Sequence, residues 1–236
     1  MIYTVSVDII EFCDAYNKRD CHVEWQPLSL IPTDVIEYIK MAKCDEVKKE
    51  RFAAYSALFI SINELFNKTG LALKRTEHGK PYLLENDKKI GINVSLSHSD
   101  SLAAISFSDE FEIGVDIQSE IGSDTAERLE KRFFEDVKIE SEELDNRLYL
   151  LEISPSGKAN LKGLNEAQNI KIIENKDEDF TSTWSFSEAI MKCMGEGFLS
   201  ASRIKELSVQ TKTQIYKVMR KSDTYTLSIA IKKVIM

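Results

Sequence analysis

The pattern of apolar and polar positions predicts a mixture of helices and strands. Residues 2–10 alternate loosely between apolar and polar side chains, which is typical of a strand. Residues 46–66 instead repeat apolar side chains at steps of three and four, which predicts a long helix with one buried face. That face would consist of Phe52, Tyr55, Phe59, Ile62 and Phe66.

Shorter elements follow along the chain. Residues 11–32 are mixed and contain two prolines, so we expect a loop or an irregular edge there. Thr33 offers an N-cap for a further helix, and helices are also expected at residues 124–134 and 184–194. Short apolar runs predict strands at residues 94–96, 102–107, 148–151, 170–173 and 225–231.

The order of these elements indicates the fold class and a division of the chain. Helices and strands without a regular strand–helix–strand rhythm predict the α+β class. The polar turn at residues 108–110 separates two predicted parts, residues 1–109 and residues 110–236. Since no linker rich in glycine, serine or proline lies between them, we expect the two parts to pack closely.

An aspartate within a short apolar strand is the first candidate for chemistry. In the run Gly114-Val115-Asp116-Ile117-Gln118, a period of two places Val115 and Ile117 on one face and Asp116 with Gln118 on the other. A buried carboxylate without a partner is costly, so a buried Asp116 requires a cation or a hydrogen-bond donor. The alternative is an exposed aspartate at the end of a strand, or one that caps a turn.

A glutamate and a lysine one helical turn apart form the second candidate. Ser185 and Glu188 fit a capping box, in which the glutamate only accepts from a backbone N–H, and Glu188 with Lys192 fits a surface ion pair. The functional alternative is that Asp116 and Glu188 hold one Mg²⁺ ion, with Lys192 beside it to bind phosphate. Mg²⁺ is commonly held by one or two carboxylates together with phosphate oxygens and waters. His98 would then add a donor to the same phosphates.

Composition narrows the class of partner. The 236 residues include 31 Lys and Arg against 39 Asp and Glu, which gives a formal net charge of −8. This sign argues against nucleic-acid binding, which needs a basic face, but it permits a local basic pocket. The four cysteines are scattered without metal-ligand spacing, and no run resembles a signal peptide or a membrane span. We therefore expect a cytoplasmic protein with reduced thiols and no membrane contact.

The order of several short motifs resembles a known family. Between residues 79 and 197 the chain contains Gly79-Lys80-Pro81, Ser97-His98-Ser99, Gly114-Val115-Asp116-Ile117, Arg132-Phe133-Phe134, Trp184 with Glu188, Ala189 and Lys192, and Gly195-Glu196-Gly197. In this order the motifs are similar to those of the 4′-phosphopantetheinyl transferases, specifically the long Sfp type. The resemblance extends weakly to Arg51, and residues 1–45 and 141–180 carry no matching motif.

The resemblance implies a fold and a reaction. Two similar α/β halves, packed with pseudo-twofold symmetry, would hold coenzyme A between them, and a monomer would suffice. The protein would transfer the 4′-phosphopantetheine arm of coenzyme A to a serine of an acyl or peptidyl carrier protein and release 3′,5′-ADP. Transfer of this kind depends mainly on positioning and on charge neutralisation, here with Mg²⁺.

The resemblance also implies residue roles. Asp116 and Glu188 would bind Mg²⁺, Gln118 would reach the ion through a water, and Asp116, Glu188 and Lys192 would form the catalytic group. Coenzyme A would be contacted by Arg51 at its nucleotide end and by Lys80, Ser97, His98 and Lys192.

Three positions depart from the family pattern. Gln118 replaces an acid, Ser187 replaces a lysine, and Lys138 stands where an acid is expected. The last two positions are candidates for activating the serine hydroxyl, so the departures concern the general base more than coenzyme A binding. Two alternatives stay open. One is a homologue that binds coenzyme A or a carrier protein but transfers little. The other is an unrelated α+β domain in which Glu188 only caps a helix and Asp116 is only a turn acid.

Overall fold

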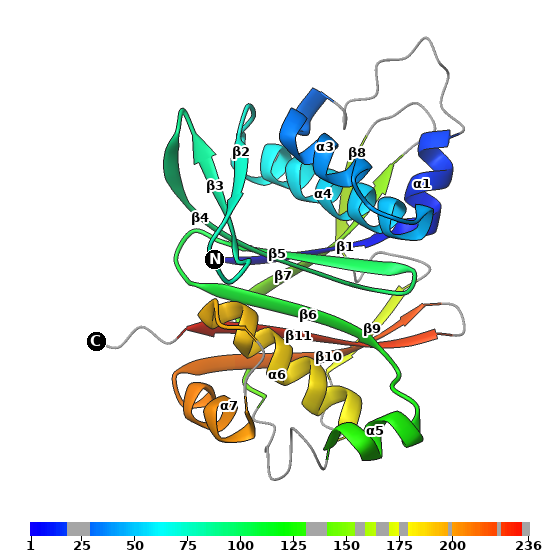
Figure 1. Cartoon of the computed structure of the whole chain (residues 1–236), viewed down its shortest axis with the longest axis vertical. Helices are drawn as coiled ribbons and strands as arrows, with labels where there is room; N and C mark the ends of the chain where they lie inside the picture. Colours follow the sequence, from blue (N-terminus) through cyan, green and yellow to red (C-terminus); the bar gives the residue numbers. More distant parts are fainter. Residues whose placement is uncertain are drawn as a thin grey trace.

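The two sheets of this protein stack between layers of helices (Figure 1). The computed structural model describes residues 1–17, 29–130, 141–153, 159–163, 170–174, 179–197, 200–220 and 223–232. These residues form an α+β fold, which confirms the predicted class. One apolar core lies between the two sheets, and a further core lies between each sheet and its helices.

The first sheet has seven strands in the order β2-β3-β4-β5-β1-β7-β8. Their bounds are Ala72–Arg75 (β2), Pro81–Glu85 (β3), Lys88–Ser99 (β4), Leu102–Ser108 (β5), Ile2–Asp8 (β1), Asn146–Ile153 (β7) and Ala159–Gly163 (β8). Neighbouring strands are antiparallel, except that β1 and β7 run parallel. The outer face of this sheet is covered by α1 (Ile9–Asn17), α3 (Thr33–Lys40) and α4 (Asp45–Phe66).

The second sheet has four antiparallel strands in the order β6-β11-β10-β9. Their bounds are Ile113–Ser119 (β6), Asp223–Lys232 (β11), Thr211–Arg220 (β10) and Ile170–Glu174 (β9). Helices α6 (Phe180–Met194) and α7 (Ala201–Ser208) cover its outer face, whereas α5 (Ser123–Leu129) buries none of its side chains.

Helix α4 confirms the long helix that the apolar repeat predicts, but its burial is wider than expected. All ten residues from 53 to 62 are buried, instead of one stripe only. The reason is that α1 and α3 both pack against α4, so side chains on its flanks are covered as well as those facing the sheet. The helix ends at Asn67, whose φ of 52° is left-handed.

Several predicted boundaries were wrong for local reasons. Helix α1 begins at Ile9, where we expected a strand and then a loop, and its buried side chains Ile9, Phe12 and Cys13 recur at helical spacing. Helix α6 begins at Phe180, four residues earlier than expected, because the Asp179 side chain accepts from Ser182 N at 2.7 Å. Ser185 and Glu188 are therefore inside the helix, and the capping box is wrong.

Other expectations are confirmed, shifted or outside the described residues. The strands predicted from short apolar runs are all present, within β4, β5, β7, β9 and β11. Thr33 is not an N-cap, since Pro32 occupies that position and no side chain caps α3. Helix α5 covers the first part of residues 124–134, and residues 131–140 lie outside the described ones.

The two sheets do not follow the division of the chain at residue 109. Strands β7 and β8 belong to the predicted second part, yet they extend the sheet built by residues 2–108. The second sheet takes its strands from the predicted second part alone. The division into residues 1–109 and 110–236 stays a prediction, and β7 and β8 show that the second part contributes strands to the sheet of the first.

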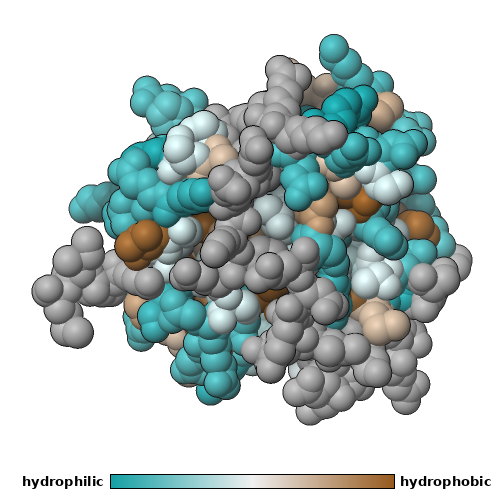
Figure 2. All heavy atoms as spheres, turned by 90° about the horizontal axis from the view of Figure 1, so that it is seen from below, coloured by the Kyte–Doolittle hydropathy of each residue, from teal (hydrophilic) through white to brown (hydrophobic). Residues whose placement is uncertain are grey.

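The described surface has few large apolar side chains. Those that are exposed lie in α1, in α3 and at its C-cap, at the C-cap of α7, and in β10: Ile10, Tyr38, Met41, Val209 and Met219. Figure 2 shows one face on which the described residues are mainly hydrophilic, with isolated hydrophobic residues between them. Within the described part of the chain, no helix combines the length and the apolar character needed to cross a bilayer.

Candidate functional site

Asp116 is the centre of a buried polar cluster between β4 and β6. The strand alternation predicted for β6 is confirmed, because Val115 and Ile117 enter the core between the sheets. Asp116, which is 4% exposed, points the other way, and its Oδ1 accepts from Ser97 Oγ at 2.8 Å and from Lys192 Nζ at 2.7 Å. Lys192 Nζ also donates to Ser97 Oγ at 3.0 Å. Residues 97, 116 and 192 therefore form one cluster. The sequence placed all three at one site, but it did not predict the bonds of Ser97 and Lys192 to Asp116.

Two serines of β4 hold β6 in place beside this cluster. Val115 N donates to Ser95 Oγ at 3.0 Å, and Ser119 N donates to Ser99 Oγ at 3.0 Å. Because alternate side chains of a strand share a face, Ser95, Ser97 and Ser99 all point toward β6. These hydroxyl groups fix the position of Asp116 along the direction of β4.

The second oxygen of Asp116 has unused capacity. Asp116 Oδ2 is buried, and no described residue forms a hydrogen bond with it. Buried carboxylate oxygens almost always have a partner, so this atom is suited to a cation. An oxygen of this kind is the ligand that Mg²⁺ prefers.

Glu188 is the second acid near this position. It lies on α6 one turn before Lys192, and burial raises its pKa. The positive charge of Lys192 lowers this pKa, whereas the negative charge of Asp116 raises it. Among the described residues no three His, Cys, Asp or Glu side chains gather as a metal site. Two carboxylates completed by waters or phosphate oxygens would still suit Mg²⁺.

Gln118 lies on the same face of β6 as Asp116, two residues further along the strand. Its Nε2 donates to Ser99 Oγ at 3.5 Å, a long hydrogen bond. The amide is thus directed along β4 beyond Ser97, and its contact with an ion through water stays a prediction.

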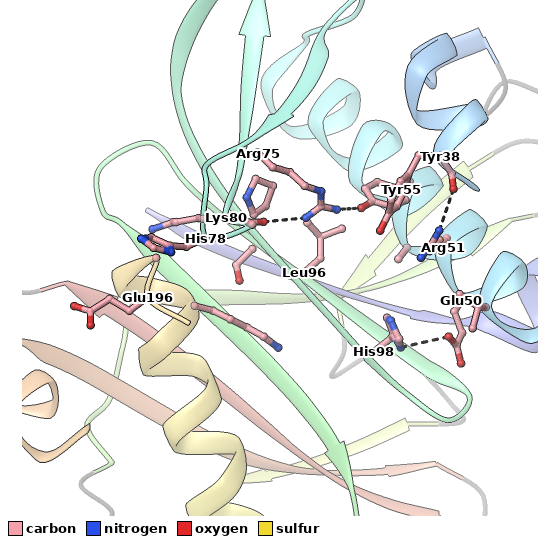
Figure 3. Close-up of a pocket in the computed structure, with 17 residues that line it drawn as sticks. Tyr38, Glu50, Arg51, Tyr55, Arg75, His78, Lys80, Leu96, His98 and Glu196 are labelled. Atoms are coloured by element: carbon pink, nitrogen blue, oxygen red, sulfur yellow. Dashed lines mark hydrogen bonds and ion pairs between the residues drawn. The ribbon is translucent and has the colours of Figure 1, made fainter. Parts of the chain in front are cut away.

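A cavity of about 440 Å³ opens beside the cluster (Figure 3). It is lined from three directions, by the first turns of α4, by the β2–β3 turn with β4, and by the end of α6. Four residues that we predicted to contact coenzyme A line it: Arg51, Lys80, His98 and Lys192. These four residues, which are up to 141 positions apart in the chain, therefore share one cavity. The fifth predicted residue, Ser97, is linked to the cavity by the hydrogen bond that its hydroxyl accepts from Lys192.

Besides Lys192, which pairs with Asp116, two of these basic residues already have acidic neighbours. Lys80 Nζ forms an ion pair with Glu112 and donates to Cys193 O at 2.5 Å. His98 Nδ1 lies 3.7 Å from Glu50 Oε2, on the side where α4 meets β4 (Figure 3). The sequence did not indicate either acid.

A cluster of arginine and tyrosine at the α4 side of the cavity was also missed. The Arg51 guanidinium stacks 4.1 Å above the Tyr38 ring and donates to Tyr38 O at 3.0 Å. Arg75 donates to Gly79 O at 3.0 Å and to the Tyr55 hydroxyl. The available signal was Arg75 four residues before the Gly-Lys-Pro turn. Tyr55 was assigned to the core, and it is buried there, but it also lines the cavity.

The cavity is basic although the chain is acidic overall. Its lining includes two arginines and two lysines, with Glu50 and Glu196 as its acids. Glu196 pairs with Arg203 at 2.7 Å, and the two lysines pair with Asp116 and Glu112. The positive character of the cavity therefore rests mainly on Arg51 and Arg75. Anions such as phosphates are favoured by such a site, and more strongly at low salt.

Of the three positions that depart from the family pattern, Gln118 lies on the face of β6 that carries Asp116, and Ser187 lies away from the cavity. Ser187 is fully buried within α6, and its hydroxyl donates to Thr183 O at 2.7 Å. It therefore faces its own helix and not the cavity. Lys138 lies outside the described residues.

Comparison with known proteins adds no assignment to this geometry. No protein-family model matches the chain, and no curated protein matches its sequence.

Proposed function

We propose that this protein is a Mg²⁺-dependent 4′-phosphopantetheinyl transferase that uses coenzyme A. The observation that carries the proposal is the junction of two features: a buried aspartate with a free carboxylate oxygen, and a basic cavity directly beside it. Lys192 joins them, since it lines the cavity and also donates to Asp116. A pyrophosphate held between a cation and basic side chains needs this arrangement.

A repeated topology supports the pseudo-twofold form of the fold. The units β1-α4-β4-β5 and β6-α6-β10-β11 have the same order of elements. In each unit the first strand pairs antiparallel with the last strand, which pairs antiparallel with the strand before it. Each unit also has its long helix on the outer face of its sheet. Two equivalent units facing each other are what a pseudo-twofold protein requires.

In the proposed reaction the hydroxyl oxygen of a carrier-protein serine attacks the phosphorus next to the pantetheine arm. A new serine–phosphate bond forms, the bond to the bridging pyrophosphate oxygen breaks, 3′,5′-ADP leaves, and the hydroxyl proton is released. Mg²⁺ would be held by Asp116 and Glu188 and would neutralise the phosphate oxygens. Lys192, beside Asp116, would orient the phosphates, and His98 would add a donor to them. Arg51 would bind the nucleotide portion.

The test is a mass measurement of acyl and peptidyl carrier proteins after incubation with the protein, coenzyme A and Mg²⁺. We expect the mass of the phosphopantetheine arm to be added. Asp116→Asn and Glu188→Gln should each lower the rate by about 100-fold or more, as removal of one fixed charge at such a site does. Glu64→Gln, at an exposed position of α4, is the control and should leave the rate unchanged.

Coenzyme A binding with and without Mg²⁺ separates the remaining alternatives. Binding without transfer to any carrier protein would identify a homologue that holds coenzyme A but has lost its general base, as Ser187 suggests. No binding of coenzyme A at all would overturn the proposal.

A further inference from the structure

The ammonium group of Lys80 is bound by two elements of the second sheet layer. Its partners are the Glu112 carboxylate, immediately before β6, and the Cys193 carbonyl, in the last turn of α6. A carbonyl at that end of a helix carries partial negative charge. The Lys80 side chain is only 14% exposed, so these contacts form in a largely covered position.

The direction of Lys80 differs from that of the other basic residues in the cavity. Glu112 and Cys193 line a second cavity of about 400 Å³ on the other side of the lysine. Neither lines the cavity that holds Arg51 and His98. The Lys80 stem borders both cavities, but its charged end is directed to the second one.

The end of α6 is shaped to receive this side chain. Gly195 caps the helix with a φ of 71°, and a Cβ placed there would lie 3.1 Å from Lys80 Cδ. On the Lys80 side of the contact, Thr76 N donates to Lys80 O at 2.9 Å, and this hydrogen bond closes the β2–β3 turn. Figure 3 shows Lys80 and His78 beside the end of α6, on the opposite side of the cavity from His98.

We infer that Lys80 and Glu112 form a clamp that joins the β2–β3 turn to the end of α6, and that both are positioning residues. The clamp sets the distance between the cavity wall at Gly79 and the helix turn that carries Lys192. Lys80 then contributes to coenzyme A binding through the shape of the cavity, not through a bond to phosphate. The statement about coenzyme A binding rests on the proposed function.

The two roles of Lys80 predict opposite effects of Glu112→Gln. If Lys80 binds phosphate, removal of the carboxylate charge frees its ammonium group, and the affinity for coenzyme A stays equal or increases. If Lys80 is a clamp, the same substitution loosens the cavity wall. The affinity then falls about three- to tenfold, in the range of coupled neighbouring residues.

Titration calorimetry with coenzyme A at two salt concentrations provides the test. We expect Lys80→Met and Glu112→Gln to weaken binding to a similar degree. The double variant should be no weaker than Lys80→Met, because both substitutions remove the same contact. In all variants, the affinity for coenzyme A should change with salt concentration as much as it does in the natural protein. Lys74→Met, which removes an exposed lysine from β2, is the control for loss of one positive charge.

Three results would overturn the inference: tighter or unchanged binding by Glu112→Gln, additive losses in the double variant, or a weaker salt dependence in Lys80→Met alone. Backbone hydrogen exchange without coenzyme A tests the clamp independently. Exchange at Gly79 and Gly195 should be faster in both single variants than in Lys74→Met, and unchanged exchange would refute the clamp. If the natural protein fails to bind coenzyme A, the proposed function fails, and hydrogen exchange alone decides whether the clamp exists.

Discussion

Replacing Gly114 by alanine should push α6 away from β6. A Cβ at this position would lie 2.0 Å from Ala189 O and 2.4 Å from Cys193 N, and both are backbone atoms of the helix. No rotation of a side chain can relieve contacts with backbone atoms. To reach the 3.4 Å of an ordinary contact, the helix backbone has to retreat by about 1.4 Å.

The cost can be worked out from the packing of α6. The helix buries Phe186, Ala189 and Ile190 against the second sheet. A gap of ~0.5–1 Å already loses a quarter to a half of each contact energy. Overpacking of a core costs about 1–3 kcal/mol, and we expect the upper end because a whole helix must move. For a chain of this size ~3 kcal/mol corresponds to a decrease in Tm of about 6–12 °C.

Denaturant unfolding and thermal unfolding measure this effect, with Gly91→Ala as the matched control. Gly91 lies in β4, and a Cβ there meets no atom within 4 Å. Its replacement should be neutral, or stabilising by up to about 1 kcal/mol through the unfolded chain. If Gly114→Ala is as stable as Gly91→Ala, then α6 does not pack against β6 as closely as described. The same shift would lengthen the 2.7 Å contact between Lys192 and Asp116, so coenzyme A binding should weaken in parallel.

Three further predictions follow from other contacts. Lys192→Met should bind Mg²⁺ more tightly in calorimetry without coenzyme A, because its ammonium competes with the cation for the buried aspartate; weaker binding would contradict this competition. Asp179→Ala should lower the free energy of unfolding by about 1 kcal/mol at pH 7 through loss of the α6 cap. Burial alone would raise the pKa of Asp179, but hydrogen bonds, including that from Lys217, lower it below 3.8. The stabilisation is therefore complete above the unfolded pKa and disappears as the pH falls below about 4, where the variant and the natural protein should converge. A thiol reagent should modify exposed Cys44 in the folded protein, whereas Cys193 should react only on unfolding, because burial raises its pKa to about 12; fast reaction of Cys193 would show that the end of α6 opens.

Local periodicity correctly predicted elements whose environment repeats regularly. The alternation in β6 placed Val115 and Ile117 in the core and Asp116 away from it, because one side of that strand faces the other sheet. The same kind of reasoning failed at the start of α6. There the deciding contact is one hydrogen bond, which the Asp179 side chain accepts from the backbone N–H of Ser182. A repeat of apolar positions gives no information about a single hydrogen bond of this kind.

The sequence by itself determined the residue types of the site and the faces on which they lie. The order of short motifs brought Asp116, Lys192 and His98 into one hypothesis, and the fold places Asp116 and Lys192 in contact and Lys192 and His98 on one cavity. Only the tertiary structure decided the partners of these residues. Lys80 meets Glu112, 32 positions away, and Cys193, 113 positions away, because the two sheet layers bring a turn of one against a helix end of the other. Contacts of this kind depend on the distance between packed layers, to which side chains throughout the cores contribute, and therefore no short stretch of sequence encodes them.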